Sequence, residues 1–98
     1  MNKRKESNKQ NSNFFEELFS SKGRVRVLKA LLRLEEANIT RIVREVDMHH
    51  RVVRKHLEKL VNLGVVEEKK YGRLRFFRLN YSNPKVKLLK TLIEVFEE

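Results

Sequence analysis

The 98-residue chain has no cysteine, no tryptophan, one proline and a single aspartate. Because cysteine is absent, neither a disulfide nor a thiolate-bound metal site can form. No stretch approaches the roughly eighteen apolar residues of a membrane-spanning helix, and no secretory signal is visible. A Ser/His/Asp set, a Cys/His set and a glycine-rich phosphate loop are also missing, so the sequence indicates neither an enzyme nor a cofactor. We therefore expect a soluble cytoplasmic protein without membrane association.

Acidic residues are scarce beside basic ones: 13 Asp and Glu stand against 23 Lys and Arg, which gives a net charge of +10. Such an excess favours a polyanionic partner, most often nucleic acid and less often an anionic membrane surface. The length corresponds to one domain, and 40% hydrophobic residues suffice for a modest core.

Two helical patterns joined by a short turn at 47–49 occupy the middle of the chain, residues 40–63. Apolar residues recur at helical spacing in both: Ile42, Val43 and Val46, then Val53, Leu57, Leu60 and Val61. Thr40 is expected to cap the first helix and His49 the second, and Gly64 supplies a stop after 49–63. The second helix is strongly basic, which is typical of a helix-turn-helix.

The segments before this centre predict a flexible arm followed by two helices. Residues 1–13 are rich in Asn, Lys and Ser, and we expect a basic arm whose contact with DNA is undecided. Asn13 then caps a short helix with three phenylalanines, and Ser21 caps an amphipathic core helix over Gly23–Leu34. Ile39 is expected in a short strand.

After Gly64 the apolar period changes to about two, which predicts a hairpin over 65–79 with its reversal at 71–73. The basic residues of this hairpin have no acidic residue among them: Lys69, Lys70, Arg73, Arg75 and Arg78. Pro84, capped by Asn83, begins a last apolar-striped helix over 84–97. The expected fold is therefore mostly α (α+β), a winged helix-turn-helix domain over 14–98 with a two-stranded wing and flanking N- and C-terminal dimerisation helices.

Four short pieces between Gly23 and Leu79 resemble the ArsR-type winged helix-turn-helix regulators and their archaeal relatives. Residues 24–31 (RVRVLKAL) resemble the family's R-x-x-I-L-x-x-L helix, and residues 53–60 (VRKHLEKL) its V-S-x-H-L-x-x-L recognition helix. Residues 63–66 (LGVV) resemble its A-G-L-V, and Gly72-Arg73 its G-R in the wing. The resemblance implies a homodimer that places two recognition helices in successive major grooves. Metal-sensing residues are absent here, since the last helix has no Cys, His or Asp, and no small-molecule effector is evident.

The candidate DNA-binding residues follow from the outward face of the second helix, the start of the first and the wing tip: Thr40, Arg41, His49, His50, Arg51, Arg54, Lys55, Lys59, Lys70, Tyr71 and Arg73. Arg51 and Arg54 suit guanine edges, because arginine donates two hydrogen bonds there. Lys59 is expected at phosphate or only in water. The wing tip is expected along phosphates or in the minor groove.

The candidate dimerisation residues are the apolar surplus of the outer helices: Phe14, Phe15, Leu18, Phe19, Leu88, Leu89, Leu92, Ile93 and Phe96. The three histidines do not converge at metal-ligand spacing, and His56 is expected to be packed and hydrogen-bonded. The sequence thus predicts a homodimeric, sequence-specific regulator of transcription that binds double-stranded DNA. Two alternatives remain open, a winged-helix adaptor that binds protein and a non-specific nucleic-acid-binding protein.

Overall fold

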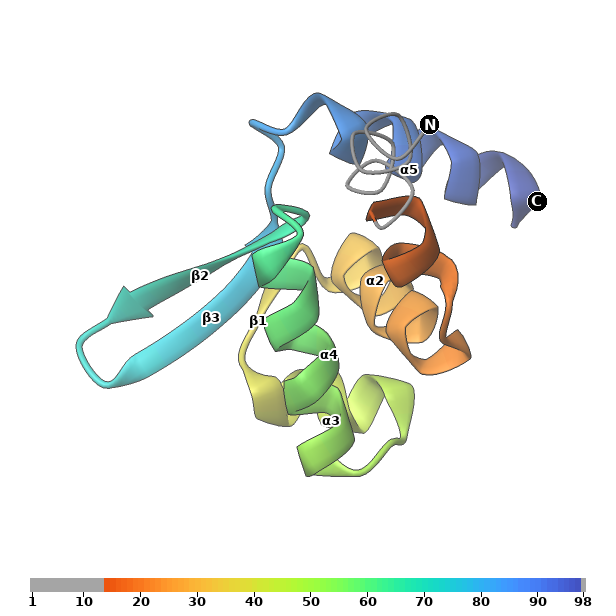
Figure 1. Cartoon of the computed structure of the whole chain (residues 1–98). Helices are drawn as coiled ribbons and strands as arrows, with labels where there is room; N and C mark the ends of the chain where they lie inside the picture. Colours follow the sequence, from red (N-terminus) through yellow and green to blue (C-terminus); the bar gives the residue numbers. More distant parts are fainter. Residues whose placement is uncertain (1–13, 98) are drawn as a thin grey trace, which may run out of the picture.

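The computed structural model describes residues 14–97, so the expected arm 1–13 and its Asn13 cap lie outside the described residues. Residues 14–19 are helical, and the labelled elements follow in the order α2 (Lys22–Leu34), β1 (Glu36–Ala37), α3 (Ile39–Val46), α4 (His50–Asn62), β2 (Val66–Tyr71), β3 (Leu74–Leu79) and α5 (Pro84–Phe96) (Figure 1). The mostly α winged helix-turn-helix fold is confirmed.

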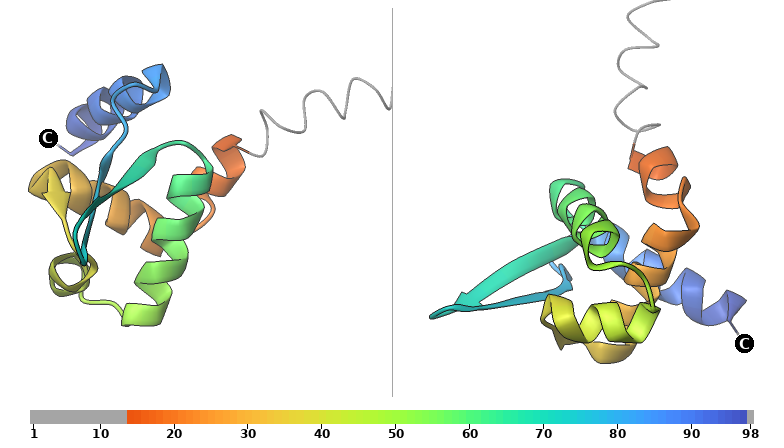
Figure 2. Two further views of the ribbon diagram at one scale, coloured as in Figure 1. Left: turned by 90° about the vertical axis from the view of Figure 1, so that its left-hand side faces the viewer. Right: turned by 90° about the horizontal axis from the view of Figure 1, so that it is seen from below.

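The described strands form an antiparallel sheet of order β1-β3-β2. Strands β2 and β3 pair from Val66 with Leu79 to Tyr71 with Leu74, and Gly72 turns the hairpin at a φ of 64°. Figures 1 and 2 show this hairpin, the wing, projecting away from the helices. The wing has the expected two strands, and Glu36–Ala37 adds a short third strand to the sheet beside β3. Ile39 is not in this strand: it begins α3.

The core lies between the helices and the base of the sheet. Its residues come from nearly every element: Leu18, Val27, Leu28, Ala30, Leu31, Ala37, Ile42, Val46, Val53, Leu57, Leu60, Val65, Val66, Phe77, Leu79, Val86 and Leu89. Burying each large aliphatic side chain contributes about 1.5–3 kcal/mol relative to exposure. Helices α2, α3 and α4 pack on one another around these residues, so α2 supports both helices of the helix-turn-helix.

Local signals fix most of the helix ends. Ser21, His49 and Asn83 cap α2, α4 and α5 as expected, each accepting a hydrogen bond from an amide of the first turn. Thr40 does not cap α3. Asn38 does, because its side-chain oxygen accepts from the Arg41 amide at 2.9 Å while Thr40 already lies within the helix.

Helix α5 lies at the opposite end of the molecule from α3 (Figure 1). Its start is tied to the end of α4, since the Gly64 carbonyl accepts hydrogen bonds from the side chains of Asn80 (3.2 Å) and Asn83 (2.9 Å). Gly64 itself has a φ of 78°, and the Val65 amide closes α4 on the Leu60 carbonyl at 3.0 Å. At the other end of α5, Lys29 forms an ion pair with Glu97 at 2.6 Å. The helix expected over 84–97 ends at Phe96.

Candidate nucleic-acid interface

Helix α4 presents an exposed basic side because its apolar side is anchored in the core. Val53, Leu57 and Leu60 are buried at helical spacing, and the residues between them turn outward. The exposed residues in its first half are His50, Arg51, Val52, Arg54 and Lys55. Val52 was not among the expected contacts. Its place between Arg51 and Val53 gave no signal, since an apolar residue there is indistinguishable by type from a core residue.

The turn before α4 is set by a left-handed residue and a histidine cap. Asp47 has a φ of 54°, a conformation that Asp tolerates better than most residues. Nδ1 of His49 accepts a hydrogen bond from the Arg51 amide at 3.1 Å. In the neutral ring the proton is then on Nε2, so an exposed N–H donor remains at the entrance to α4.

The start of α3 carries Thr40 and Arg41, both exposed. Because the Arg41 amide already donates to Asn38, only the side chain of Arg41 is available to a partner there. The Thr40 hydroxyl lies one residue earlier in the first turn, beside amides that have no partner within the helix. This helix end can therefore offer a hydroxyl and a guanidinium to an anion.

The wing carries two electrostatically different halves. At its tip, Lys70, Tyr71 and Arg73 are exposed, and the Tyr71 ring packs edge-on against Phe76 at 5.6 Å between centroids. Two cations of β3 are neutralised by the acidic residues of β2: Arg75, which lies opposite Lys70, pairs with Glu68, and Arg78 pairs with Glu67 at 3.0 Å. The hydrogen bond from Arg75 lowers the pKa of the Glu68 carboxyl. The hairpin is basic as expected, but ion pairs neutralise Arg75 and Arg78 and leave Lys70 and Arg73 unpaired.

Ion pairing separates Lys59 from the other candidates. Its Nζ lies 3.4 Å from the Glu17 carboxylate, which also receives Arg24 at 3.5 Å, so Lys59 faces the helix over 14–19. By contrast, no carboxylate of residues 14–97 lies within ion-pair distance of Arg51, Arg54, Lys55, Lys70 or Arg73. These five cations make up the unpaired basic surface.

His56 is packed on the inner edge of α4, but the expected hydrogen bond is missing at Nδ1, which is buried without a partner among the described residues. Burial, and then the nearby Arg24 charge, lower the pKa of this imidazole. The ring fills the space beside Gly23, where an added Cβ would lie 2.8 Å from Nε2. Over 14–97, His, Cys, Asp and Glu form no cluster able to hold a metal ion. No helix in this part of the chain is long and apolar enough to cross a membrane.

The expected dimerisation residues fall into three groups, which are buried, partly buried and exposed. Leu18 and Leu89 are in the core of the protomer itself, with 0% and 8% exposure, so assigning them to an interface was wrong. Phe14, Phe19 and Ile93 pack partly against that core. The exposed group is Phe15, Leu88, Leu92 and Phe96, together with Val95, which the sequence reasoning missed. Its signal was present, because Val95 follows Leu88 by seven residues and Leu92 by three.

A family model described as bacterial regulatory protein, arsR family, matches residues 21–68, from just before α2 into β2. The expected likeness to the ArsR-type winged helix-turn-helix regulators is thereby confirmed over these residues. The matched part contains α2, the helix-turn-helix and the first strand of the wing. No curated protein sequence matches this chain.

Solved structures extend the likeness over most of the chain. The homodimeric winged helix-turn-helix DNA-binding domain Mb0332 from Mycobacterium bovis, a possible ArsR-family regulator, is 20% identical with a TM-score of 0.75, covering 96% of this chain and 84% of that one. The transcriptional repressor BigR from Xylella fastidiosa is 16% identical with a TM-score of 0.73, covering 98% and 95%. The repressor PagR of Bacillus anthracis is 21% identical with a TM-score of 0.74, covering 89% and 95%. These likenesses establish the shared fold.

Proposed function

We propose that this chain is a transcription regulator of the ArsR type that binds double-stranded DNA sequence-specifically as a homodimer. The observation that carries the proposal is the unpaired basic surface, whose cations lie on the first half of α4 and at the wing tip, while Arg75 and Arg78 of β3 are paired. Cations that a fold leaves without partners on one surface are suited to phosphates and base edges.

In this proposal the first half of α4 enters the major groove. Arg51 and Arg54 donate two hydrogen bonds each to guanine edges, and Lys55 and His50 contact neighbouring bases or phosphates. Val52, exposed between the two arginines, suits the methyl group of thymine. Base reading is thereby assigned to a rigid element whose opposite side is buried.

Backbone contacts surround this helix. Nε2 of His49, the Thr40 hydroxyl and the Arg41 guanidinium lie at the starts of α4 and α3, where donors suit phosphate oxygens. Lys70, Tyr71 and Arg73 bring the wing tip onto the backbone or into the minor groove. We propose no DNA contact for Lys59, because its ammonium faces Glu17.

The dimer is proposed to form through the outward side of α5. Leu88, Leu92, Val95 and Phe96 are exposed there, and Phe15 adds a further exposed ring from the helix over 14–19. Exposed apolar residues grouped along one helix mark an interaction surface. The homodimeric Mycobacterium bovis domain, which shares the fold, supports a second copy of this chain as the partner.

Selection of binding sites from a random pool of duplexes tests the proposal. The full chain is expected to enrich a short inverted repeat and to bind it at least about a thousandfold more tightly than scrambled DNA of equal length. Equal affinities for the two duplexes would indicate a non-specific nucleic-acid-binding protein. No binding to any duplex at low salt would indicate the protein-binding adaptor.

A further inference from the structure

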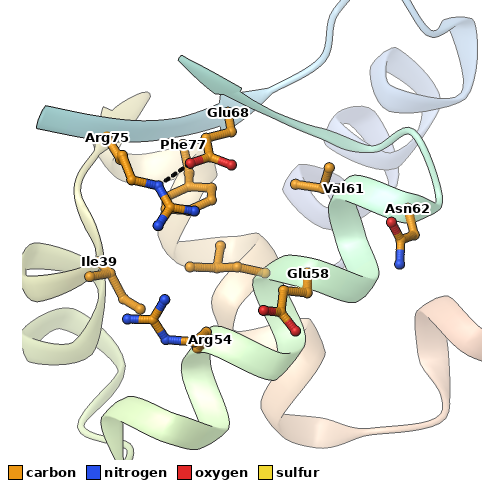
Figure 3. Close-up of a pocket in the computed structure, with 9 residues that line it drawn as sticks. Ile39, Arg54, Glu58, Val61, Asn62, Glu68, Arg75 and Phe77 are labelled. Atoms are coloured by element: carbon orange, nitrogen blue, oxygen red, sulfur yellow. Dashed lines mark hydrogen bonds and ion pairs between the residues drawn. The ribbon is translucent and has the colours of Figure 1, made fainter. Parts of the chain in front are cut away.

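A cavity of about 340 Å³ lies between α4, the wing and the start of α3, next to the unpaired basic surface (Figure 3). Its lining is Ile39, Arg54, Leu57, Glu58, Val61, Asn62, Glu68, Arg75 and Phe77. Leu57 and Phe77 belong to the core, and Ile39 and Val61 pack partly against it, so these four form an apolar floor. The volume is within the range of small-molecule sites, about 300–1,000 Å³.

The walls of the cavity carry charges of both signs. Arg54, Glu58 and Asn62 follow one another at a spacing of four on α4 and therefore form one row. Figure 3 shows the guanidinium groups of Arg54 and Arg75 approaching the cavity from α4 and from the wing. Arg75 is held in that position by its hydrogen bond to Glu68.

Two of these charges have no ion-pair partner within the described part of the chain, namely Arg54 and Glu58. They are one helical turn apart on the same row, above the apolar floor. A ligand that satisfies both must carry an anionic and a cationic group close together, and an apolar body that covers the floor.

We propose that this cavity binds a free α-amino acid with an apolar side chain. The carboxylate is received by Arg54 and Arg75, since guanidinium groups match the planar carboxylate with paired hydrogen bonds. The ammonium group lies against Glu58, and the side chain covers Leu57, Val61 and Phe77.

Other ligand chemistries fit this arrangement less well. A simple carboxylic acid leaves the negative charge of Glu58 beside it without a partner, and a simple amine does the same for Arg54. A phosphate ester carries up to two negative charges, and both Glu58 and Glu68 would repel it. The zwitterion matches the walls, and its side chain uses the floor.

This inference rests on the proposed function in one respect. Because Arg54 is the residue proposed to contact a guanine, an amino acid that binds its guanidinium removes that contact from DNA. The amino acid is then an effector that weakens DNA binding, and DNA weakens amino-acid binding by the same factor.

L-Phenylalanine is the first probe, titrated into the full chain without DNA and followed by amide NMR shifts and calorimetry. A ligand of this size in a half-open site is expected to bind with a dissociation constant on the order of 1 mM. 3-Phenylpropionate lacks the amine and 2-phenylethylamine lacks the carboxylate, so each should bind at least about tenfold more weakly. The largest shifts are expected at α4, the wing and the start of α3.

Variants identify the charges that hold the ligand. Arg54→Gln should weaken phenylalanine binding at least about tenfold. The Glu58→Gln variant should bind phenylalanine about as weakly as the native chain binds 3-phenylpropionate. Arg44→Gln, which removes an exposed arginine of α3 that does not line the cavity, is the matched control and should leave the affinity unchanged.

The inference is overturned if none of the twenty amino acids binds at about 10 mM, or if 3-phenylpropionate binds as well as phenylalanine. Shifts confined to residues outside the cavity would also overturn it. A fluorescence assay with the selected duplex is kept separate. If phenylalanine binds but DNA does not, the proposed function is contradicted and the amino-acid site stands. If DNA binds but no amino acid does, the amino-acid site is contradicted and the proposed function stands.

Discussion

Arg51 and Lys70 both carry exposed charges without carboxylate partners among residues 14–97, but the proposed complex assigns them to different parts of the duplex. Arg51→Ala is expected to cost about 1–3 kcal/mol on the selected site and much less on random DNA, because a bidentate guanine contact exists only at the right base. Lys70→Ala should weaken both duplexes about equally. Fluorescence anisotropy with the two duplexes measures the difference. Equal losses for Arg51→Ala on both would show that Arg51 contacts only the backbone.

His56 makes stability depend on pH through its depressed pKa. Because burial and Arg24 lower the pKa in the folded chain, the unfolded chain binds more protons as the pH falls below about 6.5. The stabilisation is therefore complete above the unfolded pKa and is lost as the pH falls through the folded pKa. Urea unfolding at about pH 7.5 and pH 5.5 should show lower stability at the acidic value, and His56→Gln should reduce this difference. His50→Gln, an exposed histidine of the same helix, is the control. An unchanged difference in His56→Gln would contradict the assignment.

Helix α5 has two apolar stripes, one buried in the core and one exposed, and only the exposed stripe is suited to testing the proposed dimer. Val86, Leu89 and Ile93 face the core, and Leu88, Leu92 and Phe96 face outward. Deleting the whole helix would open the core by removing Val86 and Leu89, so a truncated chain cannot separate dimer loss from unfolding. Substitutions on the outward stripe can.

The double variant Leu88→Gln/Leu92→Gln is expected to be a folded monomer, because it removes two exposed leucines and leaves the buried stripe intact. Because each copy contributes both leucines, four side chains lose their burial, and dimerisation should weaken by up to roughly 6–12 kcal/mol. Lys87→Gln/Glu94→Gln changes two exposed polar positions on the same helix, conserves net charge and should remain dimeric. Sedimentation at micromolar concentration measures both. A native chain that sediments as a single 11.8 kDa species would exclude the dimer.

At the scale of elements, the sequence predicted helix type and order well and boundaries less well. The helical period gave α2, α4 and α5, because large apolar residues recur there every three or four positions. The start of α3 was misplaced, since Asn38 and Thr40 are both good caps and only the backbone decides between them. The inner and outer leucines of α5 could not be separated either, because Leu88 and Leu89 differ only in the neighbour that each faces.

Across the whole molecule, the unpaired cations of the proposed interface lie on the first half of α4 and at the wing tip, whereas ion pairs neutralise Arg75 and Arg78 of β3 and the cations beside the helix over 14–19. DNA binding by a dimer that neutralises about six to ten phosphates is therefore expected to depend strongly on salt. A plot of log affinity against log salt should have a slope of about −5 to −9. Titrations at several salt concentrations with the selected duplex give the slope. A slope near zero would show that the chain makes no phosphate contacts.

The sequence could predict which residues of the site are basic, but not which of them form ion pairs. It placed Arg54, Arg75 and Arg78 on basic elements, yet ion pairing with Glu67 and Glu68 depends on the register between β2 and β3. The cavity was likewise unpredictable, because its lining comes from α3, α4, β2 and β3. Such a site exists only once the wing has folded against the helix-turn-helix, and it has no local signature along the chain.

The connection at Gly64 restricts the spacing of the two half-sites in the proposed operator. Its carbonyl holds Asn80 and Asn83 together, so the end of α4 and the start of α5 are linked without a flexible spacer. If α5 pairs with its mate, the angular direction of each α4 around the duplex is fixed as well. The operator must then match in rotational phase, with half-site centres about one turn, 10–10.5 base pairs, apart. Inserting about five base pairs between the halves turns one of them to the far side of the duplex, where the linked helix cannot follow.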